Sequence, residues 1–159
     1  MMRVGHGFDA HQLVAGRPFV LGGVTIPFER GPLGHSDGDA LTHAVCDALL
    51  GAAALGDLGA HFPDTDPQWK GVDSLTLLAA VHEQLVRHGW TIANIDATVV
   101  VQLPKLSPHI MAMRDALAET LTLDIAKISV KAKTSEGMGY TGDGSGIAAY
   151  AVALITSLT

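Results

Sequence analysis

The stretch from Gly34 to Asp47 constrains the fold more than any other segment, because it predicts a turn that runs into a helix of about residues 37–55. Asp39, His43 and Asp47 are spaced four residues apart, so they share one side of that helix. Apolar residues form a separate stripe on roughly the opposite side: Leu41, Val45, Ala48, Leu49 and Ala52. We therefore expect His43 to point away from the core that anchors its helix.

The start of this helix is a candidate phosphate site. Ser36 is a suitable N-cap, and Asp39 three residues later supplies a carboxylate version of the capping box. The opening turn would present free backbone N–H groups and the positive end of the helix dipole, which favour a bound phosphate. A histidine one turn into such a helix is therefore a candidate functional residue.

Composition limits the class of protein. The 159 residues suit one domain, 1–159, with a sizeable core. Hydrophobic residues make up 48% and charged residues 16%, yet the longest apolar run, Ile147 to Ile155, falls short of the roughly 20 residues of a membrane span. We expect the excess apolar surface to be buried against other subunits. A net charge of −6 with scattered Lys and Arg argues against a nucleic-acid partner.

The single cysteine, Cys46, excludes an internal disulfide and fits a reducing cytosol. The first residues show no signal-peptide pattern. The expected location is cytoplasmic, with a removed plastid transit peptide as the alternative.

The other segments predict alternating strands and helices. Strands are expected at about 3–11, 92–102, within 125–133 and at 147–158, with a hairpin at 19–27 around Gly22-Gly23, helices at about 73–88 and 107–122, and a long loop at 56–67. Periodicity alone leaves 147–158 open between helix and strand, and the uninterrupted apolar run after a glycine-rich loop favours strand. The fold class is α+β: a mixed four- to five-stranded sheet with helices packed on one face.

Asp9, His11 and His43 form a candidate metal site. Asp9 and His11 are two residues apart in a strand and leave the same face, and the helix supplies His43. Three protein ligands leave one tetrahedral position open, as in catalytic zinc sites. Asp47 could orient His43 as a carboxylate partner, and a solvent-facing Asp47 is the equal alternative.

Thr134, Ser135 and Glu136 stand where a strand ends in a glycine-rich loop. Hydroxyls, loop N–H groups and a carboxylate in one turn suit a phosphate and a hard divalent cation, although an ordinary strand-exit turn is the favoured explanation of these residues taken by themselves. The sequence lacks a P-loop, a Gly-x-Ser-x-Gly elbow and a cysteine pair. What remains is a metal site beside backbone that can bind phosphate.

Several motifs together resemble the 2-C-methyl-D-erythritol 2,4-cyclodiphosphate synthase family of the non-mevalonate isoprenoid pathway. The motifs span nearly the whole chain: Gly5–His11, His35–Asp39 with His43 and Asp47, Leu55–Gly59, Phe62–Asp66, Pro104-Lys105, and Lys133–Gly142. The resemblance implies a homotrimer with active sites between subunits. It also implies that the 2-phosphate of 4-diphosphocytidyl-2-C-methyl-D-erythritol 2-phosphate attacks the β-phosphorus, which closes the cyclodiphosphate and releases CMP.

The resemblance also implies roles for individual residues. Asp9, His11 and His43 would hold zinc, and Glu136 would help to hold Mg²⁺ or Mn²⁺. His35 and Thr134 would position and stabilise the reacting phosphates. Asp57 and Gly59 would hold the ribose, Val101 to Ser107 would surround the cytosine, and Phe62 and Asp64 would lie over the methylerythritol. The full implied substrate site comprises Ser36, Asp57, Leu58, Gly59, Phe62, Pro63, Asp64, Thr65, Asp66, Val101, Gln102, Leu103, Pro104, Lys105, Leu106, Ser107, Lys133, Ser135, Tyr140 and Asp143.

Two positions depart from the family pattern: Asp143 stands where Arg is frequent, and Tyr150 where Glu is frequent. In the resembling trimers they line a central cavity that takes isoprenoid diphosphates. Asp143 would repel a diphosphate, so we expect no such ligand here. Two other readings stay open beside the synthase, namely a metal-dependent phosphohydrolase and a trimeric binding protein with a structural metal.

Overall fold

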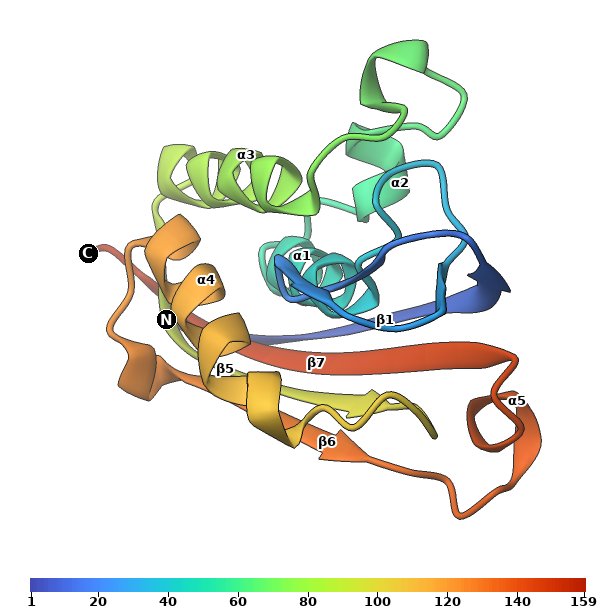
Figure 1. Ribbon diagram of the computed structural model, residues 1–159. Coiled ribbons are helices and arrows are strands. Elements are labelled where there is room, and N and C mark those ends of the chain that lie inside the picture. Colours follow the sequence, from blue (N-terminus) through green and yellow to red (C-terminus); the bar gives the residue numbers. More distant parts are fainter.

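A mixed five-stranded sheet organises the computed structural model, which describes residues 1–159 (Figure 1). The strands lie in the order β4-β1-β7-β5-β6, with the bounds β1 Met2–Ala15, β4 Arg30–Pro32, β5 Trp90–Val100, β6 Ile128–Lys133 and β7 Gly146–Ser157. β5 and β6 pair in parallel and the other neighbours antiparallel, which confirms the predicted mixed sheet. The predicted hairpin is also present, as β2 Phe19–Leu21 and β3 Val24–Ile26.

Helices cover one face of the sheet, as predicted, with α1, α3 and α4 above the strands in Figure 1. Their bounds are α1 Ala40–Ala52, α2 Leu58–His61, α3 Ser74–Arg87, α4 Ile110–Leu121 and α5 Gly139–Gly142, with 3₁₀ turns at Pro67–Trp69, Ser107–His109 and Ile125–Lys127. The 147–158 segment is a strand, as favoured. None of the helices combines the length and the hydropathy of a membrane-spanning segment.

α1 lies against β1 at a pair of glycines that set how closely the two elements approach. A Cβ on Gly5 would overlap the carbonyl oxygen of Ala48, and one on Gly7 would overlap that of Ala44. Because only hydrogen occupies these positions, the backbone of α1 rests directly on β1. This contact brings the first turn of α1 to the strand that carries Asp9 and His11.

His43 is buried, which its position on the polar stripe of the helix does not indicate. α1 contacts β1, β7, α3 and β2, so it is buried on nearly all sides. His43 itself is only 8% exposed. Because the sheet covers one side of the helix and α3 covers another, its polar stripe faces other protein groups instead of solvent.

The predicted helix start also needs correction. α1 begins at Ala40, and its N-cap is Asp39, whose side chain accepts from Thr42 N; Ser36 is not the cap. Ala40, Leu41 and Thr42 are fully buried, so the backbone N–H groups of this first turn cannot reach a phosphate. The turn that precedes the helix, and not its dipole, therefore faces the site.

Two smaller differences concern the sheet. Arg30–Pro32, where no strand was predicted, pairs with the end of β1 as the edge strand β4. In β6, Ile128 and Val130 are buried, while Ala132, which strand alternation places on their side, is exposed near the end of the strand.

The face of the sheet away from the helices carries exposed apolar side chains. On β1 and β7 these are Met2, Val4, Phe8, Tyr150 and Val152, each at least 42% exposed. Phe8 pairs with Tyr150 across the two strands, with ring centroids 5.1 Å apart. We call these five residues the open apolar face. A contiguous apolar surface of this kind indicates an interaction site.

Candidate active site

Asp9, His11 and His43 meet where β1 passes the first turn of α1. Their possible ligand atoms lie within 4.8 Å of one another. Asp9 Oδ2 is 2.7 Å from His11 Nε2 and 2.9 Å from His43 Nδ1. The predicted triad is therefore assembled, with its donor atoms facing one point.

Hydrogen bonds on the far side of each ring favour the tautomers that a metal needs. His11 Nδ1 lies 2.9 Å from the Leu33 carbonyl, which can only accept, so this nitrogen donates and Nε2 faces Asp9. His43 Nε2 lies 2.7 Å from the Ser74 hydroxyl. The Ser74 O–H donates to Asp37, so its oxygen accepts from His43 Nε2–H. Each imidazole therefore turns its other nitrogen toward the common point, as in metal-ligating histidines.

The charges of the triad are coupled. Burial alone would raise the pKa of Asp9, but hydrogen bonds and charges from His11 and His43 outweigh it and lower the pKa to about 2. Burial opposes a charge on His11, yet the hydrogen bond and charge of Asp9 raise its pKa. Asp9 therefore keeps its negative charge at neutral pH, which favours a cation at the point that the triad surrounds.

Asp47 does not orient His43, which corrects one of the two readings for this residue. Its Oδ1 accepts from Leu58 N at 2.7 Å and so holds the start of α2. Burial raises the pKa of Asp47. Besides Asp9, a second carboxylate acts on His43, that of Asp37 through Ser74. This role of Asp37 and Ser74 was not predicted, because the two residues lie far apart in the sequence.

Asp39 has a structural role in placing the triad. Its fully buried carboxylate accepts from Gly22 N and Gly23 N, each at 2.8 Å, and from the backbone and hydroxyl of Thr42. Burial raises the pKa of Asp39 despite these donors. The residue ties the β2–β3 turn to the start of α1, and thereby fixes His43.

A cavity of about 360 Å³, the metal cavity, surrounds the triad. Its other lining residues are Gly34, His35, Ser36, Gly59, Phe62, Asp64, Trp69, Val72 and Leu77. The predicted His35, Ser36, Gly59, Phe62 and Asp64 are thus brought to the triad. Trp69, Val72 and Leu77 were missed; the T-shaped contact of Trp69 with Phe62, at 5.0 Å between ring centroids, shows how the first of them joins the wall.

Other residues predicted in this segment support its backbone. Asp57 caps α2 by accepting from Ala60 N, and Asp66 accepts from Gln68 N. The carbonyl of Asp66 lies 3.1 Å from His35 Nε2. Leu58, Pro63 and Thr65 do not line the metal cavity.

A separate cavity of about 360 Å³ gathers another predicted group, at the ends of β5 and β6. It is lined by Val101, Gln102, Leu103, Pro104, Lys105, Leu106, Ser107, Ala132, Lys133 and Thr134. It shares no residue with the metal cavity. Within one chain, Thr134 therefore lies apart from the triad.

The glycine-rich loop continues from this second cavity toward β1. The Ser135 hydroxyl bonds Met138 O and the Thr141 hydroxyl, and Glu136 is exposed. Tyr140 lines a further hollow together with His11. The Asp143 carboxylate accepts from Ser145 N, which lowers its pKa. Glu136 does not join the triad of its own chain.

Comparison with known proteins shows the family of this chain. A model of the family described as YgbB matches residues 2–156. The chain belongs to the YgbB family. Curated relatives of this family are named 2-C-methyl-D-erythritol 2,4-cyclodiphosphate synthase. One from Clostridium perfringens is 54% identical over 97% of this chain and 99% of its own, and one from Burkholderia mallei is 56% identical over 96% and 94%. The predicted resemblance is therefore confirmed, and it is to a family of enzymes.

Solved structures share the YgbB-family fold. A 2C-methyl-D-erythritol-2,4-cyclodiphosphate synthase in a CDP-bound form superposes with a TM-score of 0.89, at 41% identity over 97% of this chain and 100% of that one. The bifunctional IspDF of Campylobacter jejuni superposes with a TM-score of 0.95 at 40% identity, and the match covers 99% of this chain but 42% of that longer one. The α+β fold predicted from the sequence is thus shared with these structures.

Proposed function

We propose that this YgbB-family chain, as one domain over 1–159, converts 4-diphosphocytidyl-2-C-methyl-D-erythritol 2-phosphate into 2-C-methyl-D-erythritol 2,4-cyclodiphosphate and CMP. The observation that carries the proposal is the assembled triad, Asp9, His11 and His43, in a chain that is more than half identical to proteins named for this product.

The reaction is an internal phosphoryl transfer. An oxygen of the 2-phosphate forms a bond to the β-phosphorus, and the bond from that phosphorus to the bridging oxygen breaks. CMP leaves with the bridging oxygen and its electron pair. The nucleophile is already an anion, so the protein needs no general base; it needs in-line placement and charge neutralisation.

The donor set of the triad, two imidazoles and a carboxylate, fits zinc, and its open side faces the metal cavity. A zinc ion there would bind and polarise the β-phosphate. The second ion, Mg²⁺ or Mn²⁺, is assigned to Glu136, whose exposed carboxylate is a ligand that hard cations prefer. The geometry of the triad by itself supports a divalent metal ion, and zinc is our proposal for its identity.

Residues around the triad would hold the reacting groups. His35 and Ser36 line the metal cavity on the turn that Asp37 and Asp39 fix, so His35 can position a phosphate beside the metal ligands. Phe62 and Asp64 face the same space from the α2 segment. Thr134 lines the other cavity, and from there it would stabilise the negative charge of the reacting phosphates.

The cavity of Val101 to Ser107 is the proposed cytidine site. Val101 N donates to Lys133 O and Leu106 O accepts from His109 N, whereas the backbone groups between these two residues make no such bond and can bind a base edge. Lys133 lies beside them and can meet the diphosphate. A CDP-bound relative with the same fold supports a nucleotide ligand for this chain.

The proposed assembly is a homotrimer with sites between subunits. Two observations support it: the cytidine cavity and the metal cavity share no residue, and the open apolar face lies unpaired on β1 and β7. A neighbouring copy would cover the apolar face and bring its cytidine cavity to the triad. The cytoplasmic location and the lack of an isoprenoid diphosphate in a central cavity stay predictions.

The test is product analysis by ³¹P NMR, with the linear substrate, Zn²⁺ and Mg²⁺. The proposal predicts one cyclic diphosphate and one CMP per substrate consumed. Linear phosphates would instead show a phosphohydrolase.

His43→Ala should lower turnover at least about a thousandfold while the fold persists, because the triad loses a ligand. Parental turnover in this variant would favour a structural metal and contradict the proposal.

A further inference from the structure

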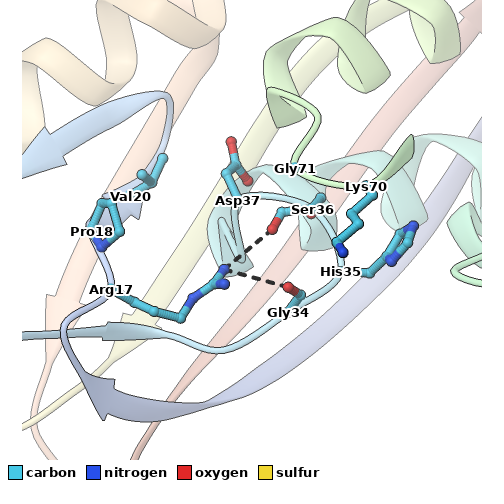
Figure 2. A pocket seen from close by; sticks show the side chains of 9 residues that line it. All are labelled: Arg17, Pro18, Val20, Gly34, His35, Ser36, Asp37, Lys70 and Gly71. Carbon is cyan, nitrogen blue, oxygen red and sulfur yellow. Dashed lines mark hydrogen bonds between the residues drawn. The ribbon is translucent and has the colours of Figure 1, made fainter. Parts of the chain in front are cut away.

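A third cavity, of about 490 Å³, lies next to the metal cavity and shares Gly34, His35 and Ser36 with it. Figure 2 shows its remaining lining, which is formed by Arg17, Pro18, Val20, Asp37, Lys70 and Gly71. Arg17 and Lys70 approach the Gly34–Ser36 turn from opposite sides in this view. We call this space the cationic cavity.

Arg17 serves as the fixed cation of this cavity. It is half-buried, and its Nε donates to Pro32 O at 2.7 Å, while Nη2 donates to Gly34 O at 3.4 Å and Ser36 O at 3.3 Å. All three partners are neutral carbonyls, and no carboxylate forms an ion pair with it. The guanidinium charge therefore remains uncompensated, and Nη1 has no partner.

Lys70 is the second cation, and its backbone is held close to the same turn. Gly71 N donates to His35 O at 2.8 Å, and Asp37 N donates to Val72 O at 3.2 Å. These two bonds align residues 70–72 with 35–37. The ammonium of Lys70 makes no hydrogen bond or ion pair with the protein.

Asp37 is the one carboxylate in the lining, and it does not neutralise these cations. Its oxygens accept from Asp39 N at 3.1 Å, from Ser74 N at 2.9 Å and from the Ser74 hydroxyl. In Figure 2 its side chain points away from both Arg17 and Lys70. Two cations beside an open cavity without a counter-charge are an arrangement that binds anions.

We propose that the cationic cavity binds a phosphate monoester dianion, with Lys70 as the mobile donor and Arg17 as the fixed one. The compact charge of lysine suits a phosphate as a point charge, and the half-buried guanidinium strengthens the field. The dianion has two possible sources. It can be the phosphate arm of a substrate whose diphosphate lies at the triad, which rests on the proposed function, or a separate phosphate ester.

The test uses inorganic phosphate as the probe and metal-free protein in EDTA, so that neither turnover nor the metal contributes. Binding is measured by titration calorimetry and by the imidazole NMR signals of His35. Lys70→Gln should weaken phosphate binding at least about tenfold, because one charge-assisted hydrogen bond is lost. The matched control is Lys127→Gln, since Lys127 is exposed and makes no side-chain contact; it should bind as the parent does.

The assignment is overturned if the parent protein binds no phosphate, or if Lys70→Gln binds it as tightly as the parent. An unshifted His35 signal on phosphate addition would also count against it. These outcomes do not depend on cyclisation. The phosphate site can therefore be disproved while the proposed enzymatic function holds, and the enzymatic function can be disproved while the phosphate site holds.

Kinetics of the metal-loaded parent enzyme then separate the two sources. If inorganic phosphate raises KM without changing kcat, the cavity takes an arm of the substrate; if it changes kcat, the ligand is a separate phosphate ester. In both cases Lys70→Gln should reduce the sensitivity to phosphate. Full phosphate sensitivity in this variant would place the anion at the metal instead and contradict the assignment.

Discussion

The residues around His43 determine how it can bind a metal. Ser74 lies between Asp37 and His43 Nε2, so a carboxylate acts on the ring through one hydroxyl. This relay holds the proton on Nε2 and leaves Nδ1 facing Asp9. The orientation of His43 therefore depends on Ser74, a residue that does not line the metal cavity.

Ser74→Ala should lower the affinity for Zn²⁺ about 10- to 100-fold, because His43 Nε2 loses its shorter hydrogen bond and keeps only the 3.1 Å contact with the Ser36 hydroxyl. Thr76→Ala is the control, since Thr76 is exposed on the same helix. Competition with a fluorescent zinc chelator measures both variants. Equal affinity in the parent and the Ser74 variant would show that the relay does not set the tautomer.

The triad should also make the metal-free protein sensitive to acid. Asp9 has a folded pKa of about 2 against an ordinary 3.8, so its ion pairs stabilise the fold above about pH 4 and are lost as the pH falls toward 2. The loss amounts to roughly 2 kcal/mol. The raised pKa of His11 acts in the opposite window: its contribution is complete at low pH and is lost as the pH rises through that pKa.

Urea unfolding in EDTA tests this for Asp9→Asn. The parent should be the more stable at about pH 5, and the difference should shrink toward about pH 2.5. A difference that stays constant over this range would contradict the lowered pKa of Asp9.

At the scale of elements, the packing of α1 on β1 places the site. Gly7→Ala would drive a methyl group into the carbonyl of Ala44, so we expect a loss of about 3 kcal/mol or more in the free energy of unfolding. Gly51→Ala is the control within α1, where the nearest atom lies 3.9 Å from the new Cβ. It should stabilise the helix by about 0.5–1 kcal/mol.

Chemical unfolding measures both glycine variants. If Gly7→Ala unfolded at the same denaturant concentration as the parent, the close approach of α1 to β1 could not be what positions His43.

Most elements could be predicted from the sequence because local patterns decide them. The alternation of apolar residues in β5, the Gly22-Gly23 turn and the Asp73 cap of α3 each act within a few residues. The start of α1 could not be predicted in this way. Asp39 caps the helix while its carboxylate also accepts from Gly22 N and Gly23 N, which lie far from Asp39 in the sequence. The burial of His43 likewise follows from tertiary packing and not from helical spacing.

The same limit applies to the candidate site. Asp9, His11 and His43 were found because strand and helix spacing place them on definite faces, and metal-ligand chemistry restricts the residue types. Most of the other positions came from the resemblance. Ser74, Trp69 and the hydrogen bond from Leu58 N to Asp47 depend on how distant segments meet, which the periodicity of one segment does not show.

At the scale of the whole molecule, the open apolar face is the proposed trimer contact. Val152→Glu should dissociate the trimer, because a charge would be buried in an apolar interface. The cyclisation rate should fall when the trimer dissociates, since the metal cavity of one subunit then separates from the cytidine cavity of its neighbour. Val86→Glu on α3 is the control, because Val86 is 52% exposed on the helical side of the molecule. Analytical ultracentrifugation measures the assembly, and a trimeric, active Val152 variant would contradict this contact.

In the proposed trimer, a metal held by Asp9, His11 and His43 faces the cytidine cavity of a neighbouring subunit. A crystal grown with Zn²⁺ and CDP, measured at the zinc absorption edge, tests it directly. We predict an anomalous peak bonded to these three residues, with the cytosine of CDP in the Val101 to Ser107 cavity of an adjacent copy. An anomalous peak elsewhere, or a nucleotide and metal bound far apart, would contradict it.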